Sequence, residues 1–476
     1  MSAAVRDASS LAEFIRNRRW FRSKTRNIEK AEVVDIIDGP GSAQILIVKL
    51  DYAEGDCDHY VLTDTNNNSG QPVEALDDPD FRGELLNAFL TSAMQRGQNG
   101  ELVFSRTNAL RGSVDGRKLP SSVSRAEQSN PSIIFGDQFI LKLFRKIEPG
   151  TNPDVEIGAF LTERGFANTP AVLGTLEYRT RSNHVYSAGI LQEFVPNQGD
   201  AWKYTLDSLK GYFDRAAQPG ASDPATSDPQ QLVGEYLKSA ALLGQRTAEM
   251  HIALSTAKGN PDFEPQPFTP EAGRKLHDEM LAQADIAFET LRRKRAALSG
   301  EAAEAAQKLL HLENRVTERF TALRHRNLTA SRIRIHGDYH LGQVLWNGSD
   351  FKIIDFEGEP ARPLQERRAM SLAMRDVAGM LRSFQYAAYA ALFNRGDNGT
   401  LDRWADACDG WVSAAFLSSY LQTAQSNVFM PEGEAEQRLL RDAFLLHKAL
   451  YEVAYELNNR PDWVRIPLKG ILSLVA

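Results

Sequence analysis

The sequence is poor in cysteine and in long apolar runs, and each shortage excludes a class of protein. Cys57 and Cys408 are the two cysteines, and neither belongs to a Cys-x-x-Cys pattern. A disulfide scaffold or a zinc–thiolate site is therefore not expected, and a reducing compartment is favoured. No apolar run approaches the ~20 residues of a membrane-spanning helix, and residues 1–24 lack the apolar segment of a signal peptide. We expect a cytoplasmic protein that has no membrane partner.

An excess of positive charge is also missing. The chain has 62 acidic and 55 basic residues, which give a formal net charge of −7. A nucleic-acid partner is not expected, because such a partner needs a broad basic face. Apolar residues make up 42% of the chain and charged residues 25%, a mixture typical of a globular protein.

Strand-like and helical stretches follow one another in an order that predicts an α+β protein of three parts. Residues 1–92 mix short helices with strands and are interpreted as an N-terminal α/β cap module. Residues 93–196 are rich in strands, and residues 197–476 are mostly helical.

Turn and cap residues predict finer features within these parts. Gly136-Asp137-Gln138 predicts a hairpin turn, and Asn152-Pro153 predicts the start of a helix that ends at Gly165. Residues 214–230 predict a surface loop, and residues 268–327 predict a pair of helices with a break near Ser299-Gly300.

The most informative segment runs from His336 to Gln343 and is followed twelve residues later by Asp355. Gly348-Ser349-Asp350 predicts a turn between two short strands, and such a hairpin brings Asp355 back beside Gln343. A carboxylate and an amide oxygen can then share one Mg²⁺ ion. Asp338, at the mouth of the loop, can accept a proton from an attacking hydroxyl. This order of base, amide and metal-binding aspartate is that of kinases.

The alternative is a loop whose His and Asp side chains only cap turns, but the full ordered set favours a kinase. A kinase also needs a lysine that holds the phosphates, and Lys142 lies within a predicted strand. We predict that Lys142 forms an ion pair with Glu156 on the following helix. Taken alone, Lys142 is better explained as a solvated charge on an edge strand.

Two further segments are candidates for binding ATP. The turn before the Lys142 strand, residues 127–132, would cover the triphosphate, although it is not rich in glycine. The strand near residue 192 falls where the hinge between two lobes should be, and a plain edge strand explains it equally well. The candidate nucleotide-binding residues are Ser129, Asn130, Ser132, Lys142, Gln192, Phe194 and Val195.

The chain resembles the maltokinases, which are ATP-dependent sugar kinases, over nearly its whole length. The segments that carry the resemblance are 127–137 with 141–144, 152–156, 195–202, 336–345 with 355–360, 375–380 and 451–467. The resemblance implies a bilobal fold like that of aminoglycoside phosphotransferases and protein kinases, with a β-rich N-lobe, a helical C-lobe and the added cap module. It also implies ATP and Mg²⁺ as cofactors, with Asp338 as base and Gln343 and Asp355 on the metal.

The same resemblance implies a substrate and a metabolic setting. Members of the family phosphorylate the anomeric hydroxyl of maltose, and the product, maltose 1-phosphate, feeds α-glucan and glycogen synthesis. Maltose often comes from a trehalose synthase, which is a possible partner. The family pattern has Asn-Thr where this chain has Asn130-Pro131, and proline lacks an N–H that could contact phosphate.

A maltose site needs aromatic faces and polar groups, and the C-terminal part of the chain offers both. Lys448, Tyr451 and Tyr455 are spaced to lie on one face of a helix, and Trp463 follows. His336 and His340 flank the base and complete the candidate substrate residues. The alternatives are that both tyrosines are core residues and that His336 only braces the loop.

Two rival functions remain open. The first is a related sugar kinase such as a glucosamine kinase, which shares the catalytic loop. The second is a non-catalytic pseudokinase that docks on a trehalose synthase. A pseudokinase predicts the loss of Lys142, Asp338 or Asp355, and all three are present.

Overall fold

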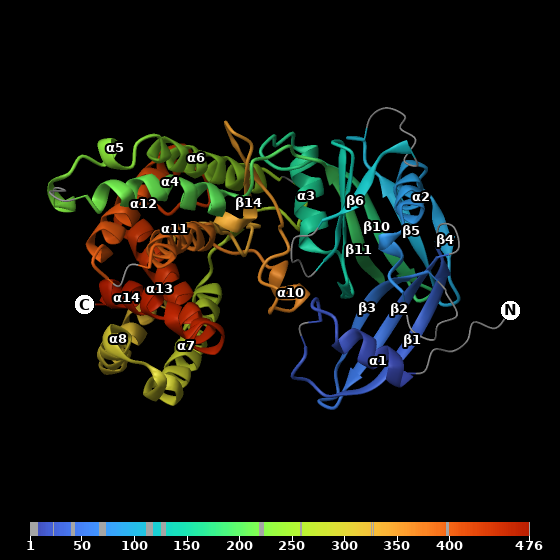
Figure 1. Ribbon diagram of the computed structural model, residues 1–476, viewed down its shortest axis with the longest axis horizontal. Coiled ribbons are helices and arrows are strands. Elements are labelled where there is room, and N and C mark those ends of the chain that lie inside the picture. Colours follow the sequence, from blue (N-terminus) through green and yellow to red (C-terminus); the bar gives the residue numbers. More distant parts are fainter. Residues whose placement is uncertain are drawn as a thin grey trace. The chain divides into compact units, whose positions relative to one another are not determined.

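The structure is a computed structural model that describes residues 8–21, 23–39, 43–65, 73–110, 118–124, 130–218, 223–257, 259–324, 326, 328–396 and 399–475. The chain forms two compact units (Figure 1). The β-rich unit consists of Met1–Pro196 with Arg362–Arg367. The helical unit consists of Asn197–Ala361 with Arg368–Ala476.

The described residues of the β-rich unit form two antiparallel sheets and three longer helices. These helices are α1 (Ala8–Arg16), α2 (Pro79–Leu90) and α3 (Pro153–Glu163). Its strands are β1 (Ile28–Asp38), β2 (Gln44–Tyr52), β3 (Cys57–Asp64), β4 (Met94–Arg96), β5 (Gly100–Arg106), β6 (Ser121–Val123), β7 (Ser132–Phe135), β8 (Phe139–Leu143), β9 (Lys146–Ile147), β10 (Val172–Thr180) and β11 (Val185–Glu193). The strand orders are β1-β2-β3-β9 and β4-β5-β10-β11-β8-β7-β6.

One hydrophobic core joins the two sheets. Ile45 and Val61 of the smaller sheet belong to the same buried cluster as Phe104 and Leu141 of the larger sheet. Residue 92 is the predicted end of the cap module. Apolar side chains from before and after it are buried in this same core, so the two segments stabilise each other. A cap module that is separate from the N-lobe stays a prediction.

Local sequence signals in the β-rich unit are confirmed where they lie close together along the chain. Strands β7 and β8 pair with Phe135 opposite Phe139, as the Gly136-Asp137-Gln138 turn predicts. Helix α3 begins after Asn152, whose side chain accepts a hydrogen bond from the backbone N–H of Asp154. Short-range capping and turn geometry explain both results.

The helical unit is built mainly from helices. The helices that follow α3 along the chain are α4 (Ala201–Ala216), α5 (Pro229–Leu232), α6 (Glu235–Ser255), α7 (Pro270–Lys294), α8 (Gly300–His311), α9 (Glu313–Arg324), α10 (Leu364–Arg367, which belongs to the β-rich unit), α11 (Met374–Asn394), α12 (Asp402–Ala424), α13 (Glu434–Asn459) and α14 (Arg465–Val475). The short strands of the helical unit are β12 (Gln266–Pro267), β13 (Ser331–Arg332), β14 (Val344–Trp346) and β15 (Phe351–Ile353).

Two details of the predicted helices need correction. The segment 268–327 contains three helices, α7, α8 and α9, in place of the predicted pair. The segment 214–230 is not a loop throughout, because α4 continues to Ala216 and α5 begins at Pro229. Asp228 starts α5 by accepting a hydrogen bond from the backbone N–H of Gln230. No helix among the described residues is long and apolar enough to span a membrane.

Candidate functional site

The loop that carries Asp338 is hydrogen-bonded to the buried carboxylate of Asp376 on α11. The backbone N–H of His336 donates to Asp376 Oδ2 at 2.7 Å, and that of Gly337 donates to Oδ1 at 2.9 Å. Asp376 is 1% exposed, so these are buried, charge-assisted hydrogen bonds. The two bonds fix the backbone immediately before Asp338, which is itself partly exposed.

Helix α11 can approach this loop closely because residue 379 is glycine. A Cβ atom at Gly379 would lie 2.5 Å from the carbonyl oxygen of Tyr339. The side chain of Tyr339 is anchored on the other side, where its hydroxyl lies 2.9 Å from Thr247 Oγ1 on α6. The loop is thus held between α6 and α11, and these contacts fix the position of Asp338, the candidate base.

A second buried layer supports Asp376. His251 Nε2 lies 3.1 Å from Asp376 Oδ2, and His251 Nδ1 lies 2.9 Å from the Tyr420 hydroxyl. Burial alone would raise the pKa of Asp376, but the hydrogen bonds from His251 and Gly337 outweigh it and hold the pKa below its ordinary value. Asp376 is therefore an anion at neutral pH and accepts all three hydrogen bonds.

His336 braces the loop, which is one of the two roles considered for it. Its side chain is buried, its Nε2 lies 2.9 Å from the carbonyl oxygen of Ile354, and its Nδ1 faces the backbone N–H of Asp338 at 3.4 Å. Both ring nitrogens are engaged within the protein, so the prediction that His336 contacts substrate is replaced by a structural role. His340 Nδ1 accepts a hydrogen bond from Gly342 N at 3.1 Å, and burial lowers the pKa of His340.

The predicted hairpin after the loop is confirmed, and it brings the metal-binding candidates together. β14 and β15 pair with Val344 opposite Ile353, and the backbone N–H of Ile354 donates to the carbonyl oxygen of Gln343 at 3.0 Å. Asp355 follows immediately, with φ of 66°, a backbone conformation that non-glycine residues rarely adopt.

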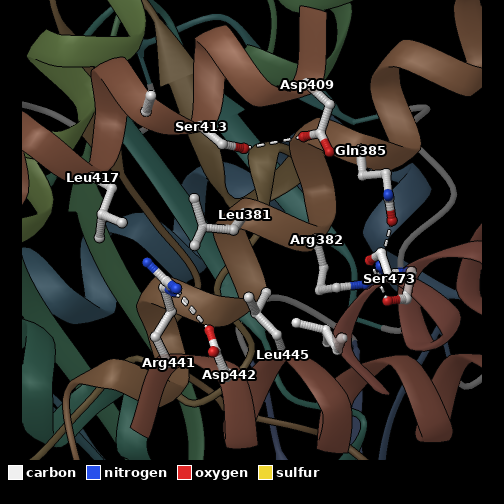
Figure 2. A pocket seen from close by; sticks show the side chains of 13 residues that line it. Leu381, Arg382, Gln385, Asp409, Ser413, Leu417, Arg441, Asp442, Leu445 and Ser473 are labelled. Atoms are coloured by element: carbon white, nitrogen blue, oxygen red, sulfur yellow. Dashed lines mark hydrogen bonds and ion pairs between the residues drawn. The ribbon is translucent and has the colours of Figure 1, made fainter. Parts of the chain in front are cut away.

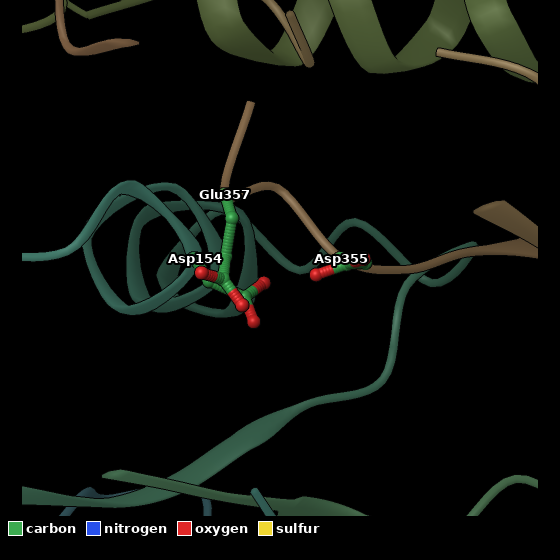
Figure 3. Close-up of side chains that lie close together, drawn as sticks. All are labelled: Asp154, Asp355 and Glu357. Carbon is green, nitrogen blue, oxygen red and sulfur yellow. The ribbon is translucent and has the colours of Figure 1, made fainter. Parts of the chain in front are cut away.

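Glu357 adds a second carboxylate next to Asp355. Figure 3 shows both side chains on the loop that follows β15, and their carboxylate oxygens lie within 4.8 Å of each other. Carboxylate and amide oxygens are the donors that Mg²⁺ prefers. The carboxylates of Asp355 and Glu357 therefore fit a magnesium ion, whose charge would neutralise nucleotide phosphates, and a part for the Gln343 amide stays a prediction. Sequence reasoning missed Glu357, although its position two residues after Asp355 was a usable signal.

Helix α13 presents a cation to Asp338. Lys448 Nζ lies 3.6 Å from Asp338 Oδ1 and 3.2 Å from Glu359 Oε1. Burial alone would lower the pKa of Lys448, but the carboxylates of Glu359 and Asp338 raise it above its ordinary value. Lys448 thus stays protonated and places a positive charge beside the carboxylate of Asp338.

Aromatic rings continue from Lys448 along α13. Lys448 Nζ lies 5.0 Å from the ring centre of Tyr451, and the rings of Tyr451 and Tyr455 stack at 6.2 Å with an interplanar angle of 22°. The Arg460 guanidinium lies over both Tyr455, at 5.7 Å, and Trp463, at 4.6 Å. The predicted single face of Lys448, Tyr451 and Tyr455 is therefore present. Tyr455 is 44% exposed, which contradicts the alternative that both tyrosines are core residues.

In the β-rich unit, Lys142 has a carboxylate partner on α3 that was not predicted. Its Nζ lies 3.0 Å from Oδ2 of Asp154, in the first turn of the helix. The predicted ion pair of Lys142 with Glu156 stays a prediction. Asp154 is 1% exposed and Lys142 sits on β8, so the pair is largely removed from solvent. Pro153 occupies the first helical position, and Asp154 and Glu156 both lie in the first turn of the helix.

The other nucleotide candidates take different positions in this unit. Asn130 is buried, and its side-chain oxygen accepts a hydrogen bond from Arg145 N at 2.9 Å, so it holds the turn before β7. Ser132 pairs with Lys142 across β7 and β8 and is also buried. Phe194 N donates to the carbonyl oxygen of Gln138 at 2.9 Å. Ser129 lies outside the described residues.

The remaining two candidates lie at the end of β11. Gln192 is partly buried and pairs with Ile140 of β8, and Val195 is 8% exposed just after the strand. The segment is thus attached to the strand that carries Lys142. A role of these residues in binding the adenine stays a prediction.

Comparison with known proteins decides the family. A profile of the phosphotransferase enzyme family, APH, matches residues 124–406, which is more than half of the chain. The chain belongs to the APH phosphotransferase family. This match confirms the predicted aminoglycoside-phosphotransferase-like fold and a phosphoryl-transfer function. The matched range of this APH phosphotransferase includes Asp338 and the β14–β15 hairpin. The bilobal arrangement stays a prediction.

Similar sequences and structures carry the name glucosamine kinase. The chain is 26% identical over 359 residues to a glucosamine kinase of Streptacidiphilus jiangxiensis, covering 73% of this chain and 72% of that protein. It is 25% identical over 354 residues to a glucosamine kinase of Mycolicibacterium smegmatis, covering 73% and 78%. A solved glucosamine kinase in complex with glucosamine, ADP and inorganic phosphate has a TM-score of 0.66 at 19% identity, covering 94% of each chain, and supports the same fold.

Sequence reasoning did not assign the residues that support the Asp338 loop and Lys448 through hydrogen bonds and ion pairs. Asp376 stood in a segment noted only for its family resemblance, and His251 and Glu359 were not singled out. An aspartate in the first turn of a long apolar helix was the available signal for Asp376. His251, on α6, carried none, because its contact with Asp376 spans 125 positions of the chain.

Proposed function

We propose that this chain transfers the γ-phosphoryl group of ATP to the anomeric hydroxyl of maltose, giving maltose 1-phosphate and ADP. The observation that carries the proposal is the pairing of Asp338 with Lys448 at 3.6 Å, next to the exposed aromatic face of α13. A sugar ring stacks its C–H surface on aromatic rings while a nearby carboxylate receives the proton of one hydroxyl.

The residues divide the work of phosphoryl transfer between them. Asp338 orients the acceptor hydroxyl and accepts its proton as the new O–P bond forms. Lys142, which forms an ion pair with Asp154, binds phosphate oxygens of the nucleotide. Asp355 and Glu357, with the predicted Gln343, would hold Mg²⁺, which would supply positive charge against the nucleotide phosphates. Positioning and charge neutralisation dominate this chemistry, so the rigid support under Asp338 is directly relevant to rate.

Glucosamine is the second candidate substrate, because the relatives described above are glucosamine kinases. An ADP-release assay over maltose, glucosamine, glucose and trehalose separates the candidates. We expect the highest kcat/KM with maltose. A higher kcat/KM with glucosamine would reject maltose, and no ADP release above background with any sugar would favour the pseudokinase.

The role of Asp338 is tested separately from the choice of sugar. Asp338→Asn keeps the size of the side chain and removes the proton acceptor. We expect kcat to fall at least about 10³-fold, with nucleotide affinity nearly unchanged in a fluorescent-nucleotide titration. Turnover close to that of the unchanged protein would remove Asp338 from the role of base.

The metabolic setting of the proposal follows from the product. A sugar 1-phosphate is an activated donor, so we propose that it serves α-glucan synthesis. We also propose that the maltose is supplied by trehalose conversion in the cytoplasm. A trehalose synthase as a physical partner stays a prediction.

A further inference from the structure

A cavity of about 360 Å³ lies within the helical unit, apart from the residues assigned to phosphoryl transfer. Side chains of α11, α12, α13 and α14 line it, and Figure 2 shows them converging on one space. Its volume falls in the range of small-ligand sites, roughly 300–1,000 Å³. Leucines form much of its wall, and they are Leu381, Leu417, Leu445 and Leu474.

The two arginines of this cavity are already paired. Arg382 Nε donates to the carboxylate of Glu452 at 2.9 Å, and its other nitrogens contact Glu452 and Gln385. Arg441 lies 2.8 Å from Asp442 on the same helix. Because each arginine has a carboxylate partner, neither offers a free positive charge to an anionic ligand.

Asp409 differs from the other charged residues of the cavity. The hydroxyl of Ser413 donates to its carboxylate at 3.0 Å (Figure 2), and no ion pair joins Asp409 to a basic group of the described residues. Burial raises the pKa of Asp409 to about 7, although the Ser413 hydrogen bond and the charge of Arg382 lower it. A carboxyl in this state gains stability from a cation placed next to it.

We propose that this cavity binds a small organic cation, whose ammonium group contacts Asp409 and Ser413 and whose apolar body packs on Leu381, Leu417 and Leu445. The Ser413 hydroxyl donates to Asp409, so its lone pairs are available to accept from the ammonium group. A carboxylate ligand is disfavoured because Asp409 and Asp442 both line the cavity.

The groups that face Asp409 set how binding depends on pH. Arg382 faces it from α11, and Asp406 from its own helix α12. Arg441 and Asp442 line the same cavity from α13, whereas α14 contributes Gly470, Ser473 and Leu474, which do not titrate. Arginines stay charged, so we expect affinity for an amine to rise between about pH 6 and pH 8.5 as Asp409 ionises.

Isothermal titration calorimetry on the full chain at pH 8.5 tests the proposal with cyclohexylmethylamine and its neutral analogue cyclohexylmethanol. We expect the amine to bind at least about tenfold more tightly than the alcohol, as a charged hydrogen bond would give. Asp409→Asn should lower amine affinity about tenfold or more. Asp207→Asn, which removes an exposed carboxylate paired with Lys203, should leave the affinity unchanged.

Three results would overturn the proposal: equal affinity for amine and alcohol, amine binding that survives Asp409→Asn, or no binding of the amine at millimolar concentration. If Asp409→Asn does not fold, Ser413→Ala decides the question. A folded Ser413→Ala protein with weakened amine binding supports the site, and one with unchanged amine binding rejects it.

Discussion

The carboxylate of Asp376 gives the sharpest test of how the catalytic loop is held. It accepts hydrogen bonds from the backbone N–H groups of His336 and Gly337 and from the ring of His251. Asp376→Asn keeps the shape of the side chain but replaces one oxygen with an NH₂ group. When the remaining oxygen serves His336 and His251, the NH₂ group faces the N–H of Gly337, and two donors oppose each other 2.9 Å apart.

The expected cost follows from these contacts. One buried N–H left without an acceptor costs about 1–3 kcal/mol, and loss of charge weakens the other two bonds by about 0.5–1 kcal/mol each. We therefore expect the free energy of unfolding to fall by about 2–5 kcal/mol. Gly337 directly precedes Asp338, so the base is displaced and kcat falls about 10²-fold, while the KM for nucleotide changes little.

Urea unfolding followed by circular dichroism measures the first effect, and ADP release measures the second. Asp207→Asn is the matched control, because it changes an exposed carboxylate and should shift stability by less than about 0.5 kcal/mol. The pKa of Asp376 is below its ordinary value, so its contribution is present above about pH 4 and is lost as the pH falls through the lowered pKa. The difference in the free energy of unfolding between the unchanged protein and Asp376→Asn should become smaller in that acidic range. An Asp376→Asn variant with unchanged stability and kcat would refute the role of Asp376.

Two other substitutions test the remaining charges. Lys142→Met removes the cation that pairs with the buried Asp154 carboxylate. We expect the KM for ATP to rise at least about tenfold. An unchanged KM for ATP would show that Lys142 does not bind phosphate. Asp409→Asn removes a carboxyl whose pKa is raised to about 7, so the folded variant no longer has to ionise an acid in an unfavourable environment. The variant should be more stable than the unchanged protein by up to about 4 kcal/mol above pH 7 and little different near pH 4. Thermal unfolding across this pH range measures the effect, and a constant difference would contradict it.

The residues that carry chemistry were predictable where their geometry depends on neighbours along the chain. The β14–β15 hairpin, the turn between β7 and β8 and the start of α3 at Asn152 follow from turn and cap residues within a few positions. The same holds for the face of α13 shared by Lys448 and Tyr455, which needs only the helical repeat. Backbone hydrogen bonds of short range fix these features, so the sequence alone suffices.

Partners that meet through packing were not predictable in this way. Spacing allowed either Asp154 or Glu156 of α3 to meet Lys142, and only the packing of the helix against the sheet shows that Asp154 lies 3.0 Å from it. His336 was open between binding substrate and bracing the loop until Ile354 and the loop backbone were seen to occupy both ring nitrogens. Each choice depends on how elements distant in sequence are oriented against one another.

The sequence by itself determined the order of the candidate groups, an aspartate followed by an amide and a second aspartate, and the local turns that present them. The tertiary structure alone decided which groups stabilise each charge. The backbone N–H of Gly337 donates a hydrogen bond to the Asp376 carboxylate, and Lys448 pairs with Asp338. The physical reason is that a turn is stabilised by a few neighbouring residues, whereas a buried charge is stabilised only by whatever group the packing of distant helices brings against it.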